Sequence, residues 1–125
     1  MSDKPIILVV EDDDDSRKLL CTMLNSLGYD PLSFARGKDA VEGAKGKKLS
    51  LALLDIMMPE MNGYEVMQKI KELPEFANLP VIMVTAKDQD AEILEGYQHG
   101  ADYYITKPYS IKQIDYGVKL FINQQ

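Results

Sequence analysis

Two hydrophobic periodicities alternate along the 125 residues of this chain. Short, nearly continuous apolar runs are typical of strands that are buried on both faces of a parallel sheet. Each run is followed by a segment whose apolar residues recur at helical spacing. The strands predicted from this pattern span residues 5–10, 30–34, 49–54, 80–84 and 102–105, and the predicted helices span residues 15–27, 39–45, 63–73, 89–99 and 111–121.

The strict alternation of strands and helices predicts the fold class. It favours a parallel sheet with right-handed crossovers, and five such units in this length match an α/β, doubly wound (βα)5 sheet with strand order 2-1-3-4-5. In that order the first and third strands flank the point where ligands bind, beyond the carboxyl ends of the strands. Because the chain has no repeat, linker or low-complexity stretch, we expect residues 1–125 to form one domain.

The composition excludes several classes of protein. Twenty acidic residues outnumber fourteen basic ones, and a net charge of −6 argues against direct binding to nucleic acid. No apolar run approaches the roughly 20 residues that cross a bilayer, and the N-terminus lacks the apolar stretch of a signal peptide. We therefore expect no membrane association and a cytoplasmic location. Cys21, the single cysteine, cannot form an internal disulfide, and we expect it to be buried in the first helix.

Five consecutive acidic residues, 11–15, follow the first predicted strand. Asp13, Asp14 and Asp15 can cap the next helix and complement its dipole, and Asp14 and Asp15 are assigned that role alone. Glu11 and Asp12 lie nearer the end of the strand and can face the same pocket as Asp55, which closes the third strand. Taken alone, this acidic run is a weak signal.

Convergence of Glu11, Asp12 and Asp55 would require a counter-charge. Two like charges about 4 Å apart repel by roughly 4 kcal/mol at an effective dielectric constant near 20. Lys107, after the fifth strand, offsets one of the three charges. The remaining charge of about −2 on hard oxygen ligands suits Mg²⁺. A raised carboxylate pKa is the alternative, and we favour the metal because a protonated Asp55 is a poor nucleophile.

An ionised aspartate beside Mg²⁺ can attack phosphorus, and aspartate is a known nucleophile in phosphoryl transfer. This reaction needs positive charge on the phosphoryl oxygens and in-line placement. Lys107 offers the charge, Thr85 offers a hydroxyl, and Ala86 offers a backbone amide. Thr85 and Lys107 are each more often structural when considered singly, so the prediction depends on four strand ends that together supply the required residue types.

Four motifs carry a resemblance to a known family. They are ILVVEDD at residues 7–13, LDIMMPEMNG at residues 54–63, VTA at residues 84–86 and GADYYITKPY at residues 100–109. With these motifs the chain resembles, over essentially its whole length, the response regulator receiver domains of two-component signalling, which have a flavodoxin-like or CheY-like fold. Together the motifs are highly specific, although none of them is specific alone.

The resemblance implies a role for each residue of the pocket. Asp55 would be the phosphoacceptor, charged by a sensor histidine kinase or a histidine phosphotransfer protein. Asp12 would bind Mg²⁺ directly, Glu11 would act beside it through water, and the backbone carbonyl of Met57 would complete the protein ligands. Glu11 departs from the commoner aspartate, but its longer side chain still reaches a metal-bound water.

The resemblance also implies how the signal leaves the pocket. Thr85, Lys107 and the Ala86 amide would contact the phosphoryl group, and Tyr104 would turn inward as Thr85 moves. This would switch the surface made by the fourth helix, fifth strand and fifth helix, which controls a downstream protein or output domain. The bond before Pro108 is expected to be cis. Two positions, Met57 and Lys87, tune hydrolysis in this family, and because Met57 cannot orient an attacking water we hypothesise a slowly hydrolysing phosphoaspartate.

Other functions stay open at this point. A phosphatase with an aspartyl-phosphate intermediate would want a carboxylate two residues after Asp55, where Met57 stands. A flavin or nucleotide carrier would want a glycine-rich first turn, where the acidic run stands. A degenerate receiver that only binds partners is disfavoured by the full set of pocket residues. The domain could be free-standing or part of a longer regulator or hybrid kinase.

Overall fold

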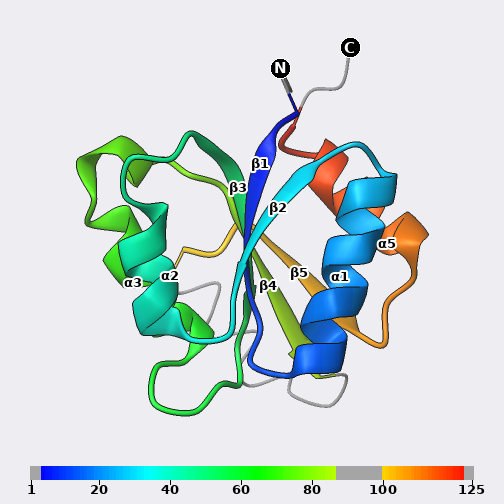
Figure 1. Cartoon of the computed structure of the whole chain (residues 1–125), viewed down its shortest axis with the longest axis horizontal. Coiled ribbons are helices and arrows are strands. Elements are labelled where there is room, and N and C mark those ends of the chain that lie inside the picture. The colour runs from blue at the N-terminus through cyan, green and yellow to red at the C-terminus, as the bar shows by residue number, and fades with distance from the viewer. Residues whose placement is uncertain (1–3, 87–99, 123–125) are drawn as a thin grey trace.

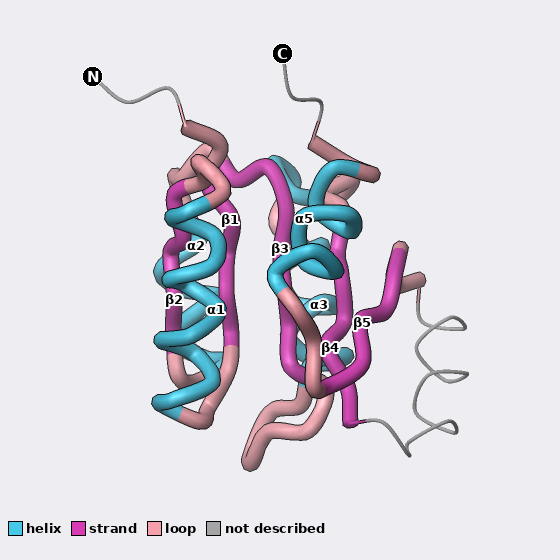
Figure 2. Tube along the Cα trace, turned by 90° about the vertical axis from the view of Figure 1, so that its right-hand side faces the viewer, coloured by secondary structure: helices cyan, strands magenta, loops and turns pink. Residues whose placement is uncertain are grey.

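The computed structural model describes residues 4–86 and 100–122. It contains a five-stranded sheet in which neighbouring strands are parallel and follow the order β2-β1-β3-β4-β5. Figure 2 shows this order across the sheet. The predicted fold class and strand order are therefore confirmed. The strands are β1 (Ile6–Val10), β2 (Asp30–Phe34), β3 (Leu49–Asp55), β4 (Val81–Ala86) and β5 (Tyr103–Lys107).

Helices cover both faces of the sheet in the described part of the chain (Figure 1). On one face lie α1 (Asp14–Ser26) and α5 (Ile111–Lys119), and on the other lie α2 (Gly37–Ala44) and α3 (Gly63–Lys71). The predicted helix at residues 89–99 lies outside the described residues. Within the described ranges, no helix has both the length and the apolar character needed to span a bilayer.

The core forms because alternate residues of each strand point to opposite faces of the sheet. In β1, Leu8 and Val10 pack into the cluster under α2 and α3, whereas Ile7 and Val9 pack into the cluster under α1 and α5. All four side chains are almost completely buried. Burial on both faces explains why the strand reads as one apolar run without polar alternation.

Three strands extend beyond their predicted ends, and β3 does so by one residue, to Asp55. β4 and β5 continue to Ala86 and Lys107, two residues beyond the predicted ends, so Thr85 and Lys107 lie within strands rather than after them. Backbone pairing continues there, with Thr85 opposite Thr106 and Ala86 opposite Lys107. Polar side chains at the end of a strand interrupt the apolar pattern, but the backbone hydrogen bonds to the neighbouring strand continue. The ends of β4 and β5 predicted from the apolar pattern were therefore two residues too early.

Helix boundaries differ from the predictions by one or two residues. The helix predicted at residues 63–73 ends at Lys71, because Leu73 is extended (ψ 125°) before Pro74, as residues preceding proline prefer. Pro74–Phe76 form a short 3-10 helix that the apolar pattern did not predict. The last helix ends at Lys119 rather than at residue 121, and α2 begins at Gly37, two residues early, and ends at Ala44, one residue before its predicted end.

The structure of α1 refines three further predictions, which concern its N-cap, its C-cap and Cys21. Of the three aspartates that the sequence offered as caps, Asp13 is the N-cap, and its carboxylate accepts the Ser16 N–H at 2.8 Å. Asp14 and Asp15 occupy the first turn of α1. They do not cap the helix there, but their negative charges complement the helix dipole. The helical pattern that ends at Leu27 predicts the next residue, Gly28, as the C-cap. The structure instead has Leu27 as the C-cap, and Gly28 follows it in the left-handed region at φ 95°. Cys21 is half-buried rather than fully buried.

Candidate functional site

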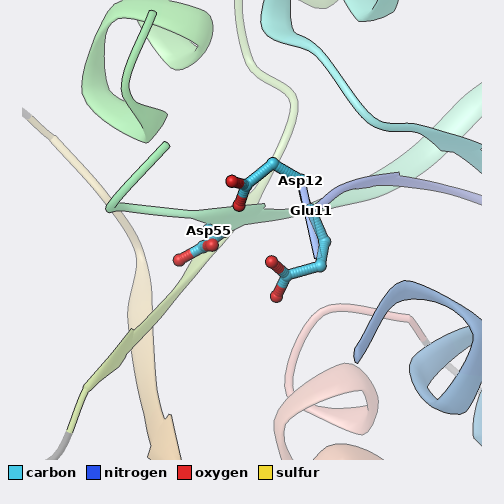
Figure 3. Close-up of side chains that lie close together, drawn as sticks. All are labelled: Glu11, Asp12 and Asp55. Carbon is cyan, nitrogen blue, oxygen red and sulfur yellow. The ribbon is translucent and has the colours of Figure 1, made fainter. Parts of the chain in front are cut away.

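Three carboxylates converge at the carboxyl edge of the sheet, as Figure 3 shows. One carboxylate oxygen from each of Glu11, Asp12 and Asp55 lies within 4.8 Å of the other two. Glu11 and Asp55 are buried, whereas Asp12 is exposed at the rim. The convergence predicted from the sequence is therefore present in the structure.

The order of the strands brings these acids together. β1 and β3 are parallel neighbours, with Val10 paired to Leu54, so the residues that follow this pair meet at the same edge of the sheet. Glu11 and Asp12 form the short turn between β1 and α1, and Asp55 is the last residue of β3. The Glu11 N–H donates to the Phe34 carbonyl of β2 at 3.1 Å, which keeps the start of the turn against the sheet.

Lys107 provides the positive charge of the site from the end of β5. Its Nζ donates to Oε1 of Glu11 at 2.8 Å and lies 3.8 Å from Oδ2 of Asp55. Burial lowers the pKa of the Lys107 ammonium, but the hydrogen bond to Glu11 and the charges of Asp55 and Glu11 outweigh it and raise that pKa above its usual value. Lys107 is therefore a firmly charged group beside two buried acids.

The Asp55 carboxyl group is strongly perturbed in the metal-free protein. Burial, a side-chain hydrogen bond with Glu11 and the Glu11 charge together raise its pKa to about 7. Lys107 and the Met57 N–H, which donates to Oδ1 at 3.3 Å, oppose this shift. The two alternatives considered from the sequence, a bound Mg²⁺ and a raised carboxylate pKa, are thus linked. Without a second cation beside Lys107, the crowded acids raise the pKa of Asp55.

The remaining pocket residues lie on neighbouring strands or on the loop after β3. Thr85 is completely buried and follows Val84, the register partner of Asp55, while Ala86 is paired with Lys107. The Thr85 hydroxyl donates to the Ala86 carbonyl at 3.5 Å, a long contact. Met57 is half exposed two residues beyond Asp55.

Three further predictions concern positions around this pocket. Tyr104 is half-buried in β5, and its hydroxyl oxygen is shielded from solvent. The Lys107–Pro108 peptide bond is cis, which agrees with the expectation from the sequence. Lys87, expected to tune hydrolysis, lies outside the described residues.

The chemistry of the donor set fits a hard divalent cation. The three clustered carboxylates supply oxygen ligands, and Lys107 leaves a net charge of about −2 to be balanced. Mg²⁺ takes one or two protein carboxylates and completes its octahedral shell with water and phosphate oxygens. The exposed position of Asp12 leaves the outer side of the cluster accessible to such ligands.

Sequence reasoning missed one residue that shapes the site. Arg17, in the first turns of α1, donates from Nη1 to the Glu11 carbonyl at 3.0 Å and from Nη2 to Asp14 at 2.6 Å. It thereby ties the turn after β1 to the helix that follows. The only signal in the sequence was the three-residue spacing between Asp14 and Arg17, which is common on helix surfaces and points to no function.

Comparisons with known proteins agree with this geometry. The sequence matches the family model described as response regulator receiver domain over residues 7–119. The probable transcriptional regulator ycf27 of Porphyridium aerugineum is 39% identical over 112 residues, which cover 90% of this chain and 45% of that protein. The alkaline phosphatase synthesis transcriptional regulatory protein PhoP of Bacillus subtilis is 34% identical over 118 residues, which cover 94% of this chain and 48% of that protein.

A solved structure provides a further comparison. The receiver domain of the sensor histidine kinase PA1611 from Pseudomonas aeruginosa has a magnesium ion coordinated in its active site cleft. It matches this chain with a TM-score of 0.88 at 26% identity, over 97% of this chain and 99% of that one. The chain spans less than half the length of the two transcriptional regulators that it matches.

Proposed function

This chain belongs to the response regulator receiver domain family of two-component systems, and on that premise we propose that Asp55 accepts the phosphoryl group. Receiver domains are phosphoacceptors with weak autophosphatase activity. The observation that carries the proposal is the convergence of Glu11, Asp12 and Asp55 within 4.8 Å, with Lys107 beside them. The chain would thus catalyse only its own phosphorylation and dephosphorylation.

The proposed donor is the phosphohistidine of a sensor kinase or of a phosphotransfer protein. A carboxylate oxygen of Asp55 attacks phosphorus, a P–O bond forms, and the P–N bond breaks. The electron pair of the broken bond leaves with the imidazole nitrogen, which takes up a proton from solvent. The product on this chain is an acyl phosphate. Lys107 is placed to neutralise the phosphoryl oxygens, since its Nζ already lies 3.8 Å from Asp55.

Asp12, Asp55 and the Met57 carbonyl would hold Mg²⁺ directly, with Glu11 acting through a water molecule. When bound, Mg²⁺ supplies positive charge that keeps Asp55 ionised and stabilises the charge on the transferring group. The pKa of Asp55, raised to about 7 in the metal-free protein, is a reason for this support, because a protonated carboxyl group is a poor nucleophile. The magnesium ion in the PA1611 receiver domain supports this assignment.

The modified pocket would then alter a surface that a partner reads. A phosphoryl group adds negative charge and oxygen acceptors at the ends of β3, β4 and β5. Thr85, buried beside this point, and Tyr104 on β5 would shift together, because packed cores switch between discrete arrangements. The proposed target is a downstream protein or an output domain of a longer regulator, and the two relatives that the chain matches are named as transcriptional regulators. A cytoplasmic location stays a prediction.

Phosphoramidate, whose P–N bond resembles that of phosphohistidine, provides a direct test. Incubation with Mg²⁺ should add one phosphoryl group to the intact protein, and a chelator should prevent the addition. Asp12→Asn should slow the reaction by more than about tenfold, because it removes a metal ligand. Asp15→Asn removes an equal charge from the exposed first turn of α1 and should react at the wild-type rate. Equal slowing by both substitutions would contradict the role of Asp12.

A further inference from the structure

The Arg17 side chain folds back from α1 onto the acidic run of residues 11–15. Its Nη1 donates to the Glu11 carbonyl at 3.0 Å, and its Nη2 donates to Oδ1 of Asp14 at 2.6 Å. The Arg17 side chain is only 18% exposed, whereas the Asp14 side chain is 74% exposed. An ion pair with an exposed acid contributes little, so the partly buried bond to the Glu11 carbonyl is the contact that constrains the turn between β1 and α1.

Asp12 lies between two peptide groups that are both held in place. A peptide group is planar and rigid, so a hydrogen bond to its carbonyl or from its N–H restricts the orientation of the whole group. The Arg17 guanidinium holds the peptide group before Asp12, through the Glu11 carbonyl. The Asp13 N–H, which donates to Oε2 of Glu11 at 3.2 Å, holds the peptide group after Asp12. The backbone of Asp12 is therefore fixed on both sides, although its side chain is exposed.

We propose that Arg17 is a positioning residue for the cation site. By holding the peptide group between Glu11 and Asp12, it keeps the Asp12 carboxylate beside those of Glu11 and Asp55 before a cation arrives. This inference rests on the proposed function, in which Asp12 binds Mg²⁺ directly, and it assigns a role to a residue that supplies no ligand. Loss of an outer partner of this kind typically weakens metal binding by about ten- to a hundredfold.

The charge of Arg17 and its hydrogen bond to Glu11 affect Mg²⁺ binding in opposite directions. A guanidinium near three carboxylates repels an incoming cation, so loss of the charge alone would strengthen Mg²⁺ binding. Loss of the hydrogen bond frees the peptide group before Asp12, and Mg²⁺ must then order that group as it binds, which weakens binding. Because Asp14 lies 2.6 Å from the guanidinium and offsets its charge, we expect the hydrogen bond to dominate.

Calorimetric titration with Mg²⁺ tests the direction of the effect. Arg17→Gln removes the charge and the paired donors, whereas Arg17→Lys keeps the charge but lacks the planar fork that reaches two acceptors. We expect both variants to bind Mg²⁺ about tenfold more weakly than wild type. Lys18→Gln removes an equal charge from the next, exposed position of α1 and should bind Mg²⁺ within about twofold of wild type. Ile114→Val lowers stability through a cavity in the core under α5, far from the turn in sequence, and should bind as wild type does.

Amide exchange in metal-free protein provides a second readout. The Asp13 N–H is protected by its hydrogen bond to Glu11, which depends on the path of the turn that Arg17 holds. We expect its exchange with water, followed by NMR, to be about tenfold faster in Arg17→Gln than in wild type. The Val81 N–H, which donates to the Asp102 carboxylate at 2.8 Å at the start of β4, is the internal control and should exchange at the wild-type rate.

The outcomes separate this inference from the proposed function. Mg²⁺ affinity at or above the wild-type value in either Arg17 variant would overturn the inference, and so would unchanged exchange of the Asp13 N–H or equal weakening in Ile114→Val. If Arg17→Gln does not fold, Arg17→Lys decides alone on both readouts. A wild type that does not bind Mg²⁺ would also overturn the inference. A wild type that binds Mg²⁺ but is not modified by phosphoramidate would sink the proposed function and leave the role of Arg17 standing.

Discussion

Gly63 lies directly against the backbone of Asp55. A Cβ built on Gly63 would sit 2.5 Å from the Asp55 carbonyl oxygen and 3.0 Å from the Cα of Ile56. The Gly63 N–H also donates to the Ile56 carbonyl at 3.0 Å, so the start of α3 and the end of β3 are held together without room for a side chain. The position of the nucleophile therefore depends on a glycine eight positions further along the chain.

Gly63→Ala should displace the end of β3, because backbone atoms cannot move aside as a flexible side chain can. We expect a loss of about 1–3 kcal/mol in the free energy of unfolding and a weaker affinity for Mg²⁺, measured by calorimetric titration. In Gly117→Ala, on α5, the atoms nearest to the added Cβ belong to the side chains of Ile105 and Tyr103 on β5, at 3.1–3.4 Å. That control should bind Mg²⁺ as wild type does. Unchanged Mg²⁺ affinity in Gly63→Ala would contradict the close contact.

Metal-free protein should lose stability as pH rises from about 4 to about 7. The pKa of Asp55 is about 7 in the folded protein against an ordinary value of 3.8, so the folded state binds more protons in this interval. The stabilisation is complete below the ordinary pKa and is lost as pH passes through the folded one. Because other acids titrate too, the quantity to measure is the difference between wild type and Asp55→Asn in urea denaturation with a chelator present.

Asp55→Asn should gain stability relative to wild type across that interval, by up to a few kcal/mol, and the difference should level off above about pH 7. Addition of Mg²⁺ at pH 7 should stabilise the wild type and leave Asp55→Asn nearly unchanged, since a ligand stabilises only the state that binds it. A difference that does not vary between pH 4 and pH 7 would show that the crowded acids do not perturb Asp55.

The sequence was sufficient to predict the fold, because the fully apolar strands and their alternation with helices admit few topologies. It also predicted that Glu11, Asp12 and Asp55 meet, since parallel neighbouring strands end at one edge. The ends of β4 and β5 could not be predicted from apolar patterning, because Thr85 and Lys107 are polar residues whose backbones remain paired.

The partners of individual side chains could not be predicted either. The sequence suggested that Lys107 offsets one of three acids but could not say which one, because the 2.8 Å and 3.8 Å distances depend on how β5 sits relative to β1. The role of Arg17 as a clamp on the Glu11 carbonyl was hidden for the same reason, and the sequence could not say which of Asp13, Asp14 and Asp15 is the N-cap. Five neighbouring acidic residues in the sequence offer several equivalent N-caps for α1. Only the three-dimensional path of the turn after β1 decides which of them caps the helix.

Tyr29→Phe should stabilise the protein. The Tyr29 ring is 1% exposed, and its hydroxyl has no hydrogen-bond partner among the described residues. An unsatisfied buried hydroxyl costs about 1–3 kcal/mol, so its removal should raise the free energy of unfolding by about 1 kcal/mol in urea denaturation. Tyr116→Phe, on the exposed face of α5, should change stability by less than about 0.5 kcal/mol. A loss of stability in Tyr29→Phe would show that the hydroxyl is hydrogen-bonded in solution.

The phosphoaspartate should be long-lived in wild type and shorter-lived in Met57→Asn. The Met57 side chain is 53% exposed beside Asp55, and a thioether cannot orient an attacking water. An amide at this position can hydrogen-bond to that water, and we expect hydrolysis to accelerate by about tenfold, measured as decay of the phosphorylated intact mass after donor removal. Met57→Leu keeps the apolar character and should decay as wild type does. Decay of the wild type within seconds at neutral pH would contradict the account.

The identity of the modified residue decides whether Asp55 is the phosphoacceptor. Borohydride reduces an acyl phosphate on aspartate to homoserine, and peptide mass spectrometry then locates the altered residue. After treatment with phosphoramidate and Mg²⁺, we predict homoserine at position 55 alone, and none in Asp55→Asn. Homoserine at position 12, or an unaltered wild-type chain after the same treatment, would contradict the assignment of Asp55 as the phosphoacceptor.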